Sequence, residues 1–101
     1  MRIIPEPYHF EWDEGNREKN LIKHHVTLEE CEEAFYDSHK RIFSTPSDSE
    51  ERFLLLAKTS NERFLFLVFT MRKQKIRVIS ARDLNKKERG LYEKDNQTPQ
   101  I

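Results

Sequence analysis

Cysteine and long apolar runs are scarce in this sequence. Its 101 residues include one cysteine, Cys31, which excludes an intramolecular disulfide and fits a reducing compartment. The longest apolar run spans residues 64–69, which is too short to cross a bilayer. The N-terminus has no continuous apolar stretch of the kind that signal peptides carry. We therefore expect a cytoplasmic protein that contains no membrane span.

Residues that bind metals or phosphate groups through loops are equally scarce. The two glycines, Gly15 and Gly90, are too few for a glycine-rich phosphate loop. The four histidines are scattered, and the adjacent His24 and His25 would point about 100° apart on a helix, so both cannot face one ion. We expect no metal and no cofactor. Cys31 falls on an apolar helix stripe, which indicates an inert core thiol rather than the nucleophile of a cysteine hydrolase.

The composition fits one small domain. Charged residues and hydrophobic residues each make up 36% of the sequence, but the apolar ones are grouped in periodic runs, which argues against disorder. We expect a single domain over residues 1–101, with a core from about 8 to 94 and a flexible tail over 95–101.

A net charge of zero conceals two halves of opposite charge. Residues 1–51 hold 6 basic and 13 acidic side chains, whereas residues 52–101 hold 12 basic and 5 acidic ones, which together give the totals of 18 and 18. Between positions 72 and 89 the basic residues are Arg72, Lys73, Lys75, Arg77, Arg82, Lys86, Lys87 and Arg89. This asymmetry indicates a surface for a polyanion, provided that the acidic half lies on the far side. A solvated strand and helix with many salt bridges would explain the charge run equally well.

The first third of the chain predicts one strand and two helices. Residues 8–12 alternate, so that three aromatic side chains share one face of a short strand. Asp13 can cap a helix over residues 14–25. Residues 27–30 have the form of a capping box and open a second helix. The core-facing stripe of this second helix would be Leu28, Cys31, Ala34 and Phe35.

The rest of the chain predicts a sheet and a final helix. Strand candidates cover residues 40–44, 53–57, 64–71 and 75–82. The third is apolar at every position from 64 to 69, so we expect it to be central and covered on both faces. Asn85 and Glu88 predict the start of a final helix that ends near Lys94. The order indicates an α+β domain with an antiparallel sheet and its helices gathered on one side.

The side chains that could carry chemistry are basic, and they suit RNA cleavage without a metal. In that reaction the ribose 2′-hydroxyl attacks the adjacent phosphorus and the 5′-oxygen leaves, so the protein must move two protons and hold extra negative charge. Histidine can transfer protons near pH 7, and the planar donors of arginine match phosphate oxygens. The candidates are Lys23, His24, Arg77, Arg82, Lys86, Lys87, Arg89 and Tyr92.

Each candidate also has a structural explanation. His24 could cap helix carbonyls, Arg77 and Arg82 could be surface charges on an edge strand, and Tyr92 could be a core aromatic. Along a regular strand Arg82 shares a face with Ser80, whereas Arg77 faces the other way, so both can serve one site only if a bulge intervenes or one acts from the rim. From the residues alone, the interpretation ends at a small α+β domain with a basic C-terminal half.

Two stretches resemble the BrnT toxin family. The first combines Phe10-Glu11-Trp12-Asp13-Glu14 with Asn20-Leu21-Ile22-Lys23-His24 and Val26-Thr27-Leu28-Glu29-Glu30, and is similar to the family pattern F-x-W-D-x, N-x-x-K-H-G-V and a capped helix. The second runs from Ile76-Arg77-Val78-Ile79-Ser80-Ala81-Arg82 through Lys87-Glu88-Arg89 to Tyr92-Glu93, and is similar to R-I-I-S-A-R and E-R-x-x-Y. The resemblance covers about residues 10 to 93.

The resemblance implies a RelE-like fold, with an antiparallel sheet, two N-terminal helices and one C-terminal helix. It also implies a type II toxin that cleaves RNA, arrests growth and is neutralised by a ribbon-helix-helix antitoxin of the BrnA type, with operator DNA bound only through that antitoxin. Lys23, His24, Arg77 and Arg82 match motif positions, which makes them the candidate catalytic residues. We assign phosphate binding to the two arginines and proton transfer to His24 or Lys23. The RNA-binding candidates are Lys75, Lys86, Lys87, Arg89 and Tyr92.

One position departs from the family pattern. His25 stands where the family has glycine after Lys-His, and glycine would allow the positive φ that ends a helix there. Two other functions compete with the ribonuclease: a catalytically weak module that binds a partner within a DNA-bound repressor complex, and an RNA-binding sheet without cleavage. The second lacks the K/R-G-F/Y-G/A-F motif of such sheets.

Overall fold

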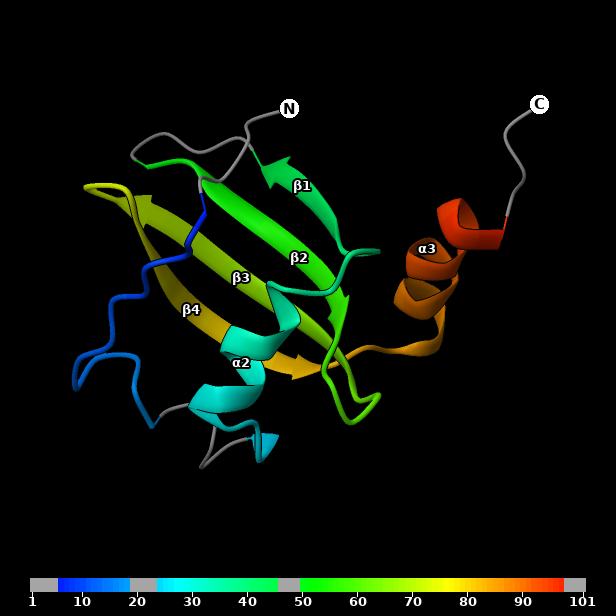
Figure 1. The fold of residues 1–101 in the computed structure, drawn as a ribbon, viewed down its shortest axis with the longest axis horizontal. Coiled ribbons are helices and arrows are strands. Elements are labelled where there is room, and N and C mark those ends of the chain that lie inside the picture. Colours follow the sequence, from blue (N-terminus) through cyan, green and yellow to red (C-terminus); the bar gives the residue numbers. More distant parts are fainter. Residues whose placement is uncertain (1–5, 19–23, 46–49, 98–101) are drawn as a thin grey trace.

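The sheet dominates the computed structural model, which describes residues 6–18, 24–45 and 50–97. Its elements are α2 (Leu28–Ala34), β1 (Arg41–Thr45), β2 (Arg52–Lys58), β3 (Phe64–Arg72), β4 (Lys75–Asp83) and α3 (Lys86–Gln97). The strands form one antiparallel sheet in the order β1-β2-β3-β4, with α2 packed across it and α3 beside one end (Figure 1). None of the described helices is long and apolar enough to cross a membrane.

The predicted RelE-like arrangement of two N-terminal helices and one C-terminal helix is wrong. In the described residues one helix, α2, precedes the sheet and one, α3, follows it; residues 14–18 form turns and bends, and residues 19–23 lie outside the described part. The cause is Asn16, which is buried and whose side-chain amide donates to the carbonyl oxygens of Glu11 and Val78 at 3.1 and 2.9 Å. This long-range contact holds the segment against β4 and overrides its local preference for helix.

The predicted first strand is reduced to a single bridge. Phe10 pairs with Ile76 in parallel, through hydrogen bonds from the Glu11 N–H to the Ile76 carbonyl (2.8 Å) and from the Ile76 N–H to the His9 carbonyl (2.7 Å). The predicted alternation is confirmed, because Tyr8, Phe10 and Trp12 all pack against the core. The N-terminal segment therefore covers part of the outer edge of β4, which would otherwise expose unpaired backbone groups.

The capping box of α2 is confirmed. The Thr27 hydroxyl accepts from the Glu30 N–H at 3.1 Å, and the Glu30 carboxylate accepts from the Thr27 N–H at 2.9 Å. The apolar stripe of this helix packs on the sheet, with Cys31, Ala34 and Phe35 buried. Burial raises the pKa of the Cys31 thiol to about 12, so it is held as an unreactive thiol.

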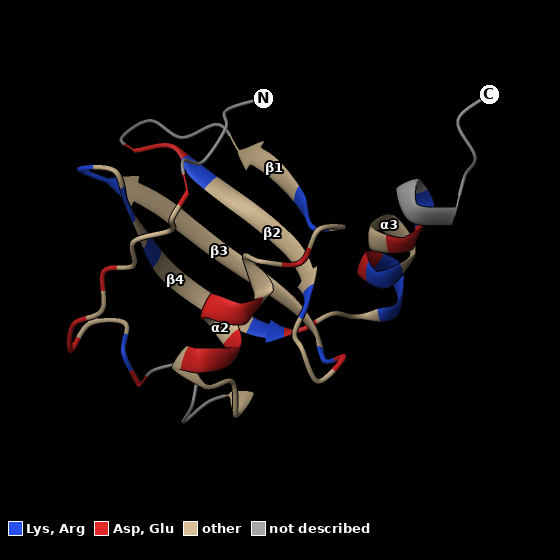
Figure 2. Ribbon diagram, viewed as in Figure 1, with Lys and Arg blue, Asp and Glu red and all other residues tan. Residues whose placement is uncertain are grey.

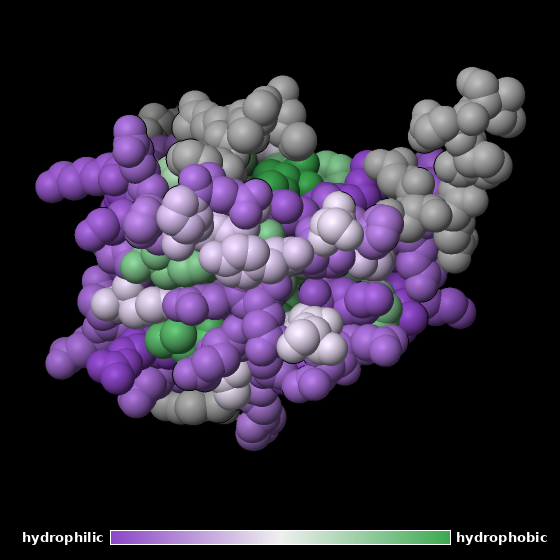
Figure 3. All heavy atoms as spheres, viewed as in Figure 1, coloured by the Kyte–Doolittle hydropathy of each residue, from purple (hydrophilic) through white to green (hydrophobic). Residues whose placement is uncertain are grey.

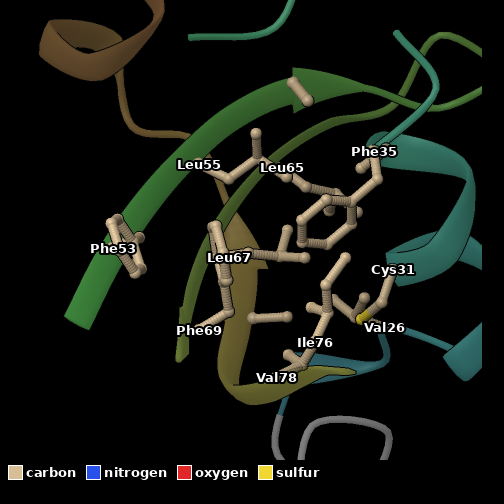
Figure 4. Close-up of a cluster of buried hydrophobic side chains, with 13 residues drawn as sticks. Val26, Cys31, Phe35, Phe53, Leu55, Leu65, Leu67, Phe69, Ile76 and Val78 are labelled. Carbon is tan, nitrogen blue, oxygen red and sulfur yellow. The ribbon is translucent and has the colours of Figure 1, made fainter. Parts of the chain in front are cut away.

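The core lies between α2 and one face of the sheet (Figure 4). Phe35 from α2 makes edge contacts with the rings of Phe69 and Phe10, and every second residue of β3, Leu65, Leu67 and Phe69, is buried there. β3 is central, as predicted, but the prediction that both of its faces are covered is wrong. Alternate residues on the other face, Phe64, Phe66 and Val68, are only half-buried.

Asp37 and Tyr92 attach α3 to the end of the sheet. Tyr92 is buried, its ring packs edge-on against Phe64, and its hydroxyl donates to Asp37 at 2.7 Å. Burial acts to raise the pKa of Asp37, but hydrogen bonds from the His39 N–H, the Tyr92 hydroxyl and the Lys58 N–H outweigh it and lower that pKa. The helix runs to Gln97, beyond its predicted end, and residues 98–101 of the predicted tail lie outside the described part.

Replacing Tyr92 by phenylalanine is expected to lower the free energy of unfolding by about 1–3 kcal/mol, because a hydrogen bond to a charged, partly buried carboxylate is lost. The matched control is Tyr36→Phe, since the Tyr36 side chain is exposed. Thermal unfolding of the three proteins measures the difference. Equal melting temperatures for the two variants would contradict the anchoring role of the Tyr92 hydroxyl.

Candidate nucleic-acid interface

The strand residues on the face opposite α2 include cations and no carboxylate, although carboxylates from neighbouring segments pair with Arg72, Arg77 and Arg82. Strand alternation and the pairing register place on it Arg41, Arg52, Lys58, Arg72, Lys75, Arg77 and Arg82. The one acidic strand residue, Asp83, pairs with Leu65 and therefore faces α2. Half-buried apolar side chains, among them Phe43, Leu54, Phe66 and Val68, lie between the cations. We call this surface the basic face.

Part of the acidic half of the chain lies on the opposite side of the sheet, on α2. α2 carries Glu29, Glu30, Glu32 and Glu33, and Figure 2 shows this helix largely red while the strands carry blue segments. Seen from the α2 side, the surface is mainly hydrophilic with small apolar areas (Figure 3). Because α2 and the basic face lie on opposite sides of the sheet, their charges are separated by the core. The condition under which the charge asymmetry could attract a polyanion is therefore met only in part, because Glu11, Asp13 and Glu50 of the acidic half pair with Arg72 and Arg77 of the basic face.

A bulge in β4 brings Arg77 and Arg82 to the same face. Ser80 pairs with Val68 and Val78 pairs with Phe69, so Ile79 is an extra residue between them. Arg77 then pairs with Thr70 and Arg82 with Phe66, four residues apart on β3, or about 13 Å at the usual rise of a strand. The two arginines share the basic face but are too far apart to bind one phosphate together.

Arg82 is oriented by a carboxylate and an aromatic ring. Its guanidinium lies over the Phe66 ring, 4.2 Å from the centroid, and its Nη1 and Nη2 donate to the two carboxylate oxygens of Glu88 at 2.8 Å each. Nη1 also donates to the Asp83 carbonyl. The hydrogen bonds from Arg82 hold the pKa of Glu88 below its usual range. This pair positions the guanidinium at the junction of β4 and α3.

Arg77 is held by the N-terminal segment. Its Nη1 and Nη2 donate to the two carboxylate oxygens of Asp13 at 2.7 and 3.0 Å, and Nη1 also donates to Glu11 at 3.2 Å. The Arg77 hydrogen bonds lower the pKa of Asp13. The Arg77 side chain is 15% exposed, against 37% for Arg82. Of the two arginines, Arg82 is the more accessible to a ligand.

The predicted RNA-binding residues occupy different positions. Lys75, Lys86 and Lys87 are exposed, the first at the start of β4 and the other two in the first turn of α3. Arg89 stacks over the Phe64 ring at 3.7 Å and donates to Glu93 at 3.1 Å. Tyr92, by contrast, is buried against Asp37, and this geometry gives it the role of attaching α3 rather than of facing a ligand.

His24 lies near the end of β4, and Lys23 lies outside the described residues. The pKa of Asp83 is lowered, first by hydrogen bonds from Arg63 and to a smaller extent by the nearby charge of His24. His24 is thus close enough to Asp83 for their charges to interact, and Asp83 follows Arg82 in the chain. His24 thus lies at the end of β4 that carries Arg82, but with Asp83 and Glu30 on the α2 side of the sheet, whereas Arg82 points to the basic face; Arg77 lies nearer the other end of β4.

His25 adopts the backbone conformation that the family glycine would adopt. Its φ is 58°, in the left-handed region, and its carbonyl accepts from Arg63 at 2.8 Å. We expect His25→Gly to raise the free energy of unfolding by up to about 1 kcal/mol, because glycine relieves the steric cost of this conformation. A β-branched residue tolerates this conformation less well, so His25→Val should lower the free energy of unfolding by about 1–3 kcal/mol. Urea denaturation measures both, and a valine variant as stable as the glycine variant would contradict the assignment.

Two important residues were not found from the sequence. Glu88 was recognised only as part of a helix start; it does accept from the Asn85 N–H, but the same carboxylate holds Arg82. Arg63 gave no signal, because it is a single cation in a turn and its partners Asp83, Glu30 and His24 are distant in sequence. For the contact between Arg82 and Glu88, the only signal in the sequence was a carboxylate six residues after an arginine on a strand.

No cluster of three or more histidine, cysteine, aspartate or glutamate side chains that could hold a metal ion occurs within the described ranges. Among curated proteins, no relative matches the chain. The model of one family, described as the ribonuclease toxin BrnT of type II toxin–antitoxin systems, matches residues 12–88. This match begins at Trp12, directly after the residues that pair with β4, and extends to Glu88, whose carboxylate holds Arg82, so that it includes the whole sheet. The chain therefore belongs to the BrnT family of ribonuclease toxins of type II toxin–antitoxin systems.

Proposed function

We propose that the chain is a metal-independent endoribonuclease that binds RNA on the basic face and uses Arg82 to hold the phosphate at which cleavage occurs. Family membership supports the ribonuclease activity and an antitoxin partner. The finer proposal adds that the toxin acts in the cytoplasm and arrests growth, and that a BrnA-like ribbon-helix-helix protein neutralises it. Operator DNA would be bound only through this antitoxin.

The observation that carries the proposal is the set of Arg82 donors still available. A guanidinium has five N–H groups, and three of those on Arg82 donate to Glu88 and the Asp83 carbonyl. Glu88 occupies the end formed by Nη1 and Nη2. In the described part of the structure, the side formed by Nε and Nη2 has no protein acceptor, and this pair of donors matches two phosphate oxygens. Glu88 thus fixes the arginine while leaving one binding edge for RNA.

The surroundings of Arg82 suit a single-stranded nucleic acid. Phe66 and Phe64 lie next to each other on the same face of β3, and Arg82 and Arg89 stack over them. Such aromatic and guanidinium planes can stack with bases, while exposed cations contact the backbone. The lysines that would contribute are Lys75, Lys86 and Lys87. Arg77 would contact a different phosphate of the same RNA, either after displacing Asp13 or while still paired with it.

The proposed chemistry needs only groups of this chain. The 2′-hydroxyl loses a proton as its oxygen bonds to phosphorus, and the 5′-oxygen gains a proton as its bond to phosphorus breaks, which leaves a 2′,3′-cyclic phosphate and a 5′-hydroxyl. Arg82 would stabilise the additional negative charge on phosphorus-bound oxygens. His24, near the same end of β4, would transfer a proton, and Lys23 stays a candidate for the same step.

The test is RNA cleavage by purified, antitoxin-free protein with and without EDTA, with the product ends identified by mass spectrometry. Cleavage that persists in EDTA and yields 2′,3′-cyclic phosphate ends is the expected result. A folded protein that cleaves neither free RNA nor RNA on ribosomes, yet still binds an antitoxin, would support the alternative of a catalytically weak binding module. Cleavage that EDTA abolishes would contradict metal independence.

A further inference from the structure

Arg63 has more structural partners than any arginine of the basic face described above. It lies between β2 and β3, and its side chain is only 26% exposed. Nε and Nη2 donate to the two carboxylate oxygens of Asp83 at 2.7 and 3.1 Å. Nη2 also donates to the His24 carbonyl at 3.2 Å, and Nη1 donates to the His25 carbonyl at 2.8 Å and to Glu30 at 3.1 Å.

These contacts use all five N–H groups of the guanidinium. Arg63 therefore has no donor left for a phosphate, in contrast to Arg82. Its partners come from three places: the end of β4, the segment that contains His24 and His25, and the capping box of α2 through Glu30. The guanidinium is planar and has donors along three edges, so that one arginine side chain can join these three elements.

We propose that Arg63 is the positioning residue of the cleavage site, because it fixes His24 and Asp83 in place at the end of β4 that carries Arg82. The inference rests on the proposed function, since it assigns His24 to proton transfer. Arg63 acts on His24 in two ways: it holds the backbone carbonyl of His24, and its charge offsets the carboxylates of Asp83 and Glu30.

The contacts give a signature that loss of stability alone would not produce. Replacing Arg63 by glutamine removes the donors that hold the His24 and His25 carbonyls, and it leaves the carboxylates of Asp83 and Glu30 without their cation. The backbone around His24 should therefore change position, whereas the packing of the core should not.

The experiment compares the backbone amide NMR shifts of His24, His25 and Asp83, together with kcat and KM for RNA cleavage. The proteins compared are wild type, Arg63→Gln, Arg63→Lys and the core variant Phe53→Leu, which provides a loss of stability in the core. In Arg63→Gln we expect shift changes at these three residues that Phe53→Leu does not show, and a fall in kcat of about tenfold or more with little change in KM. Arg63→Lys keeps the charge, but without the planar donors it should not restore kcat.

Unchanged amide shifts of His24 and His25 in Arg63→Gln, with a kcat no lower than that of Phe53→Leu, would overturn the proposal. Failure of the proposed function gives a different result: no cleavage by wild type, or full cleavage by His24→Gln. In that case the NMR shifts still decide whether Arg63 fixes the position of His24, because they do not depend on activity.

Discussion

Replacing Arg82 by alanine is expected to lower kcat for RNA cleavage by at least about a hundred-fold and to abolish growth arrest. The reason is geometric: Arg82 is the cation of β4 that Glu88 and Phe66 hold rigid while two adjacent N–H groups stay available for a phosphate. Such a pre-oriented donor pair stabilises charge that develops only in the transition state. The measurement is the single-turnover cleavage rate of a defined RNA.

Two variants make this result interpretable. Arg82→Lys keeps the positive charge but lacks the planar pair of donors, so we expect it to restore little of kcat. Arg17→Ala removes the same charge from an exposed turn outside the sheet and serves as the matched control. If Arg82→Ala retained wild-type toxicity, or if Arg82→Lys were fully active, the site would not depend on this guanidinium.

Replacing Phe35 by alanine is expected to destabilise the protein by about 3–5 kcal/mol. Phe35 is fully buried, and its ring contacts those of Phe69, Phe10 and Tyr8 at centroid separations of 5.0, 5.3 and 5.9 Å. It therefore joins α2, the sheet and the N-terminal segment. A domain of this size has a total stability of about 5–15 kcal/mol, so the variant should lose a large part of its stability.

The neighbouring residue supplies the control. Tyr36 follows Phe35 in the chain but is 58% exposed, so Tyr36→Ala should cost less than about 1 kcal/mol. Urea denaturation followed by circular dichroism measures both. Equal midpoints for the two variants would show that the contacts of Phe35 do not hold the core together.

For each candidate residue the sequence left a structural and a functional explanation. The hydrogen-bond partners and the burial of the side chain distinguish between the two. Tyr92 has the core position that was one of its two alternatives, because it is buried against Phe64 and its hydroxyl donates a hydrogen bond to Asp37. Arg77 has strong intramolecular partners in Asp13 and Glu11, whereas Arg82 retains a free donor pair within the described structure. Position on a strand did not distinguish the two arginines, but their carboxylate partners do.

The sequence by itself determined the local elements and the family. The four strands, the capping box at Thr27 and the start of α3 at Asn85 follow from alternation and from side chains that bond to neighbouring backbone groups, which are interactions within a few residues. The resemblance carried by residues 10–30 and 76–93 led to the family that the match over 12–88 shows.

Only the tertiary structure decided which residues meet. Asn16 bonds to Val78 and holds residues 14–18 of the predicted 14–25 helix in turns and bends. The extra residue Ile79 turns Arg77 to the face of Arg82, and Arg63 joins His24 to Asp83. Each depends on partners that are distant along the chain or on a one-residue shift in strand pairing. Local periodicity contains no information about such contacts, because they form only when the sheet and α2 have packed together.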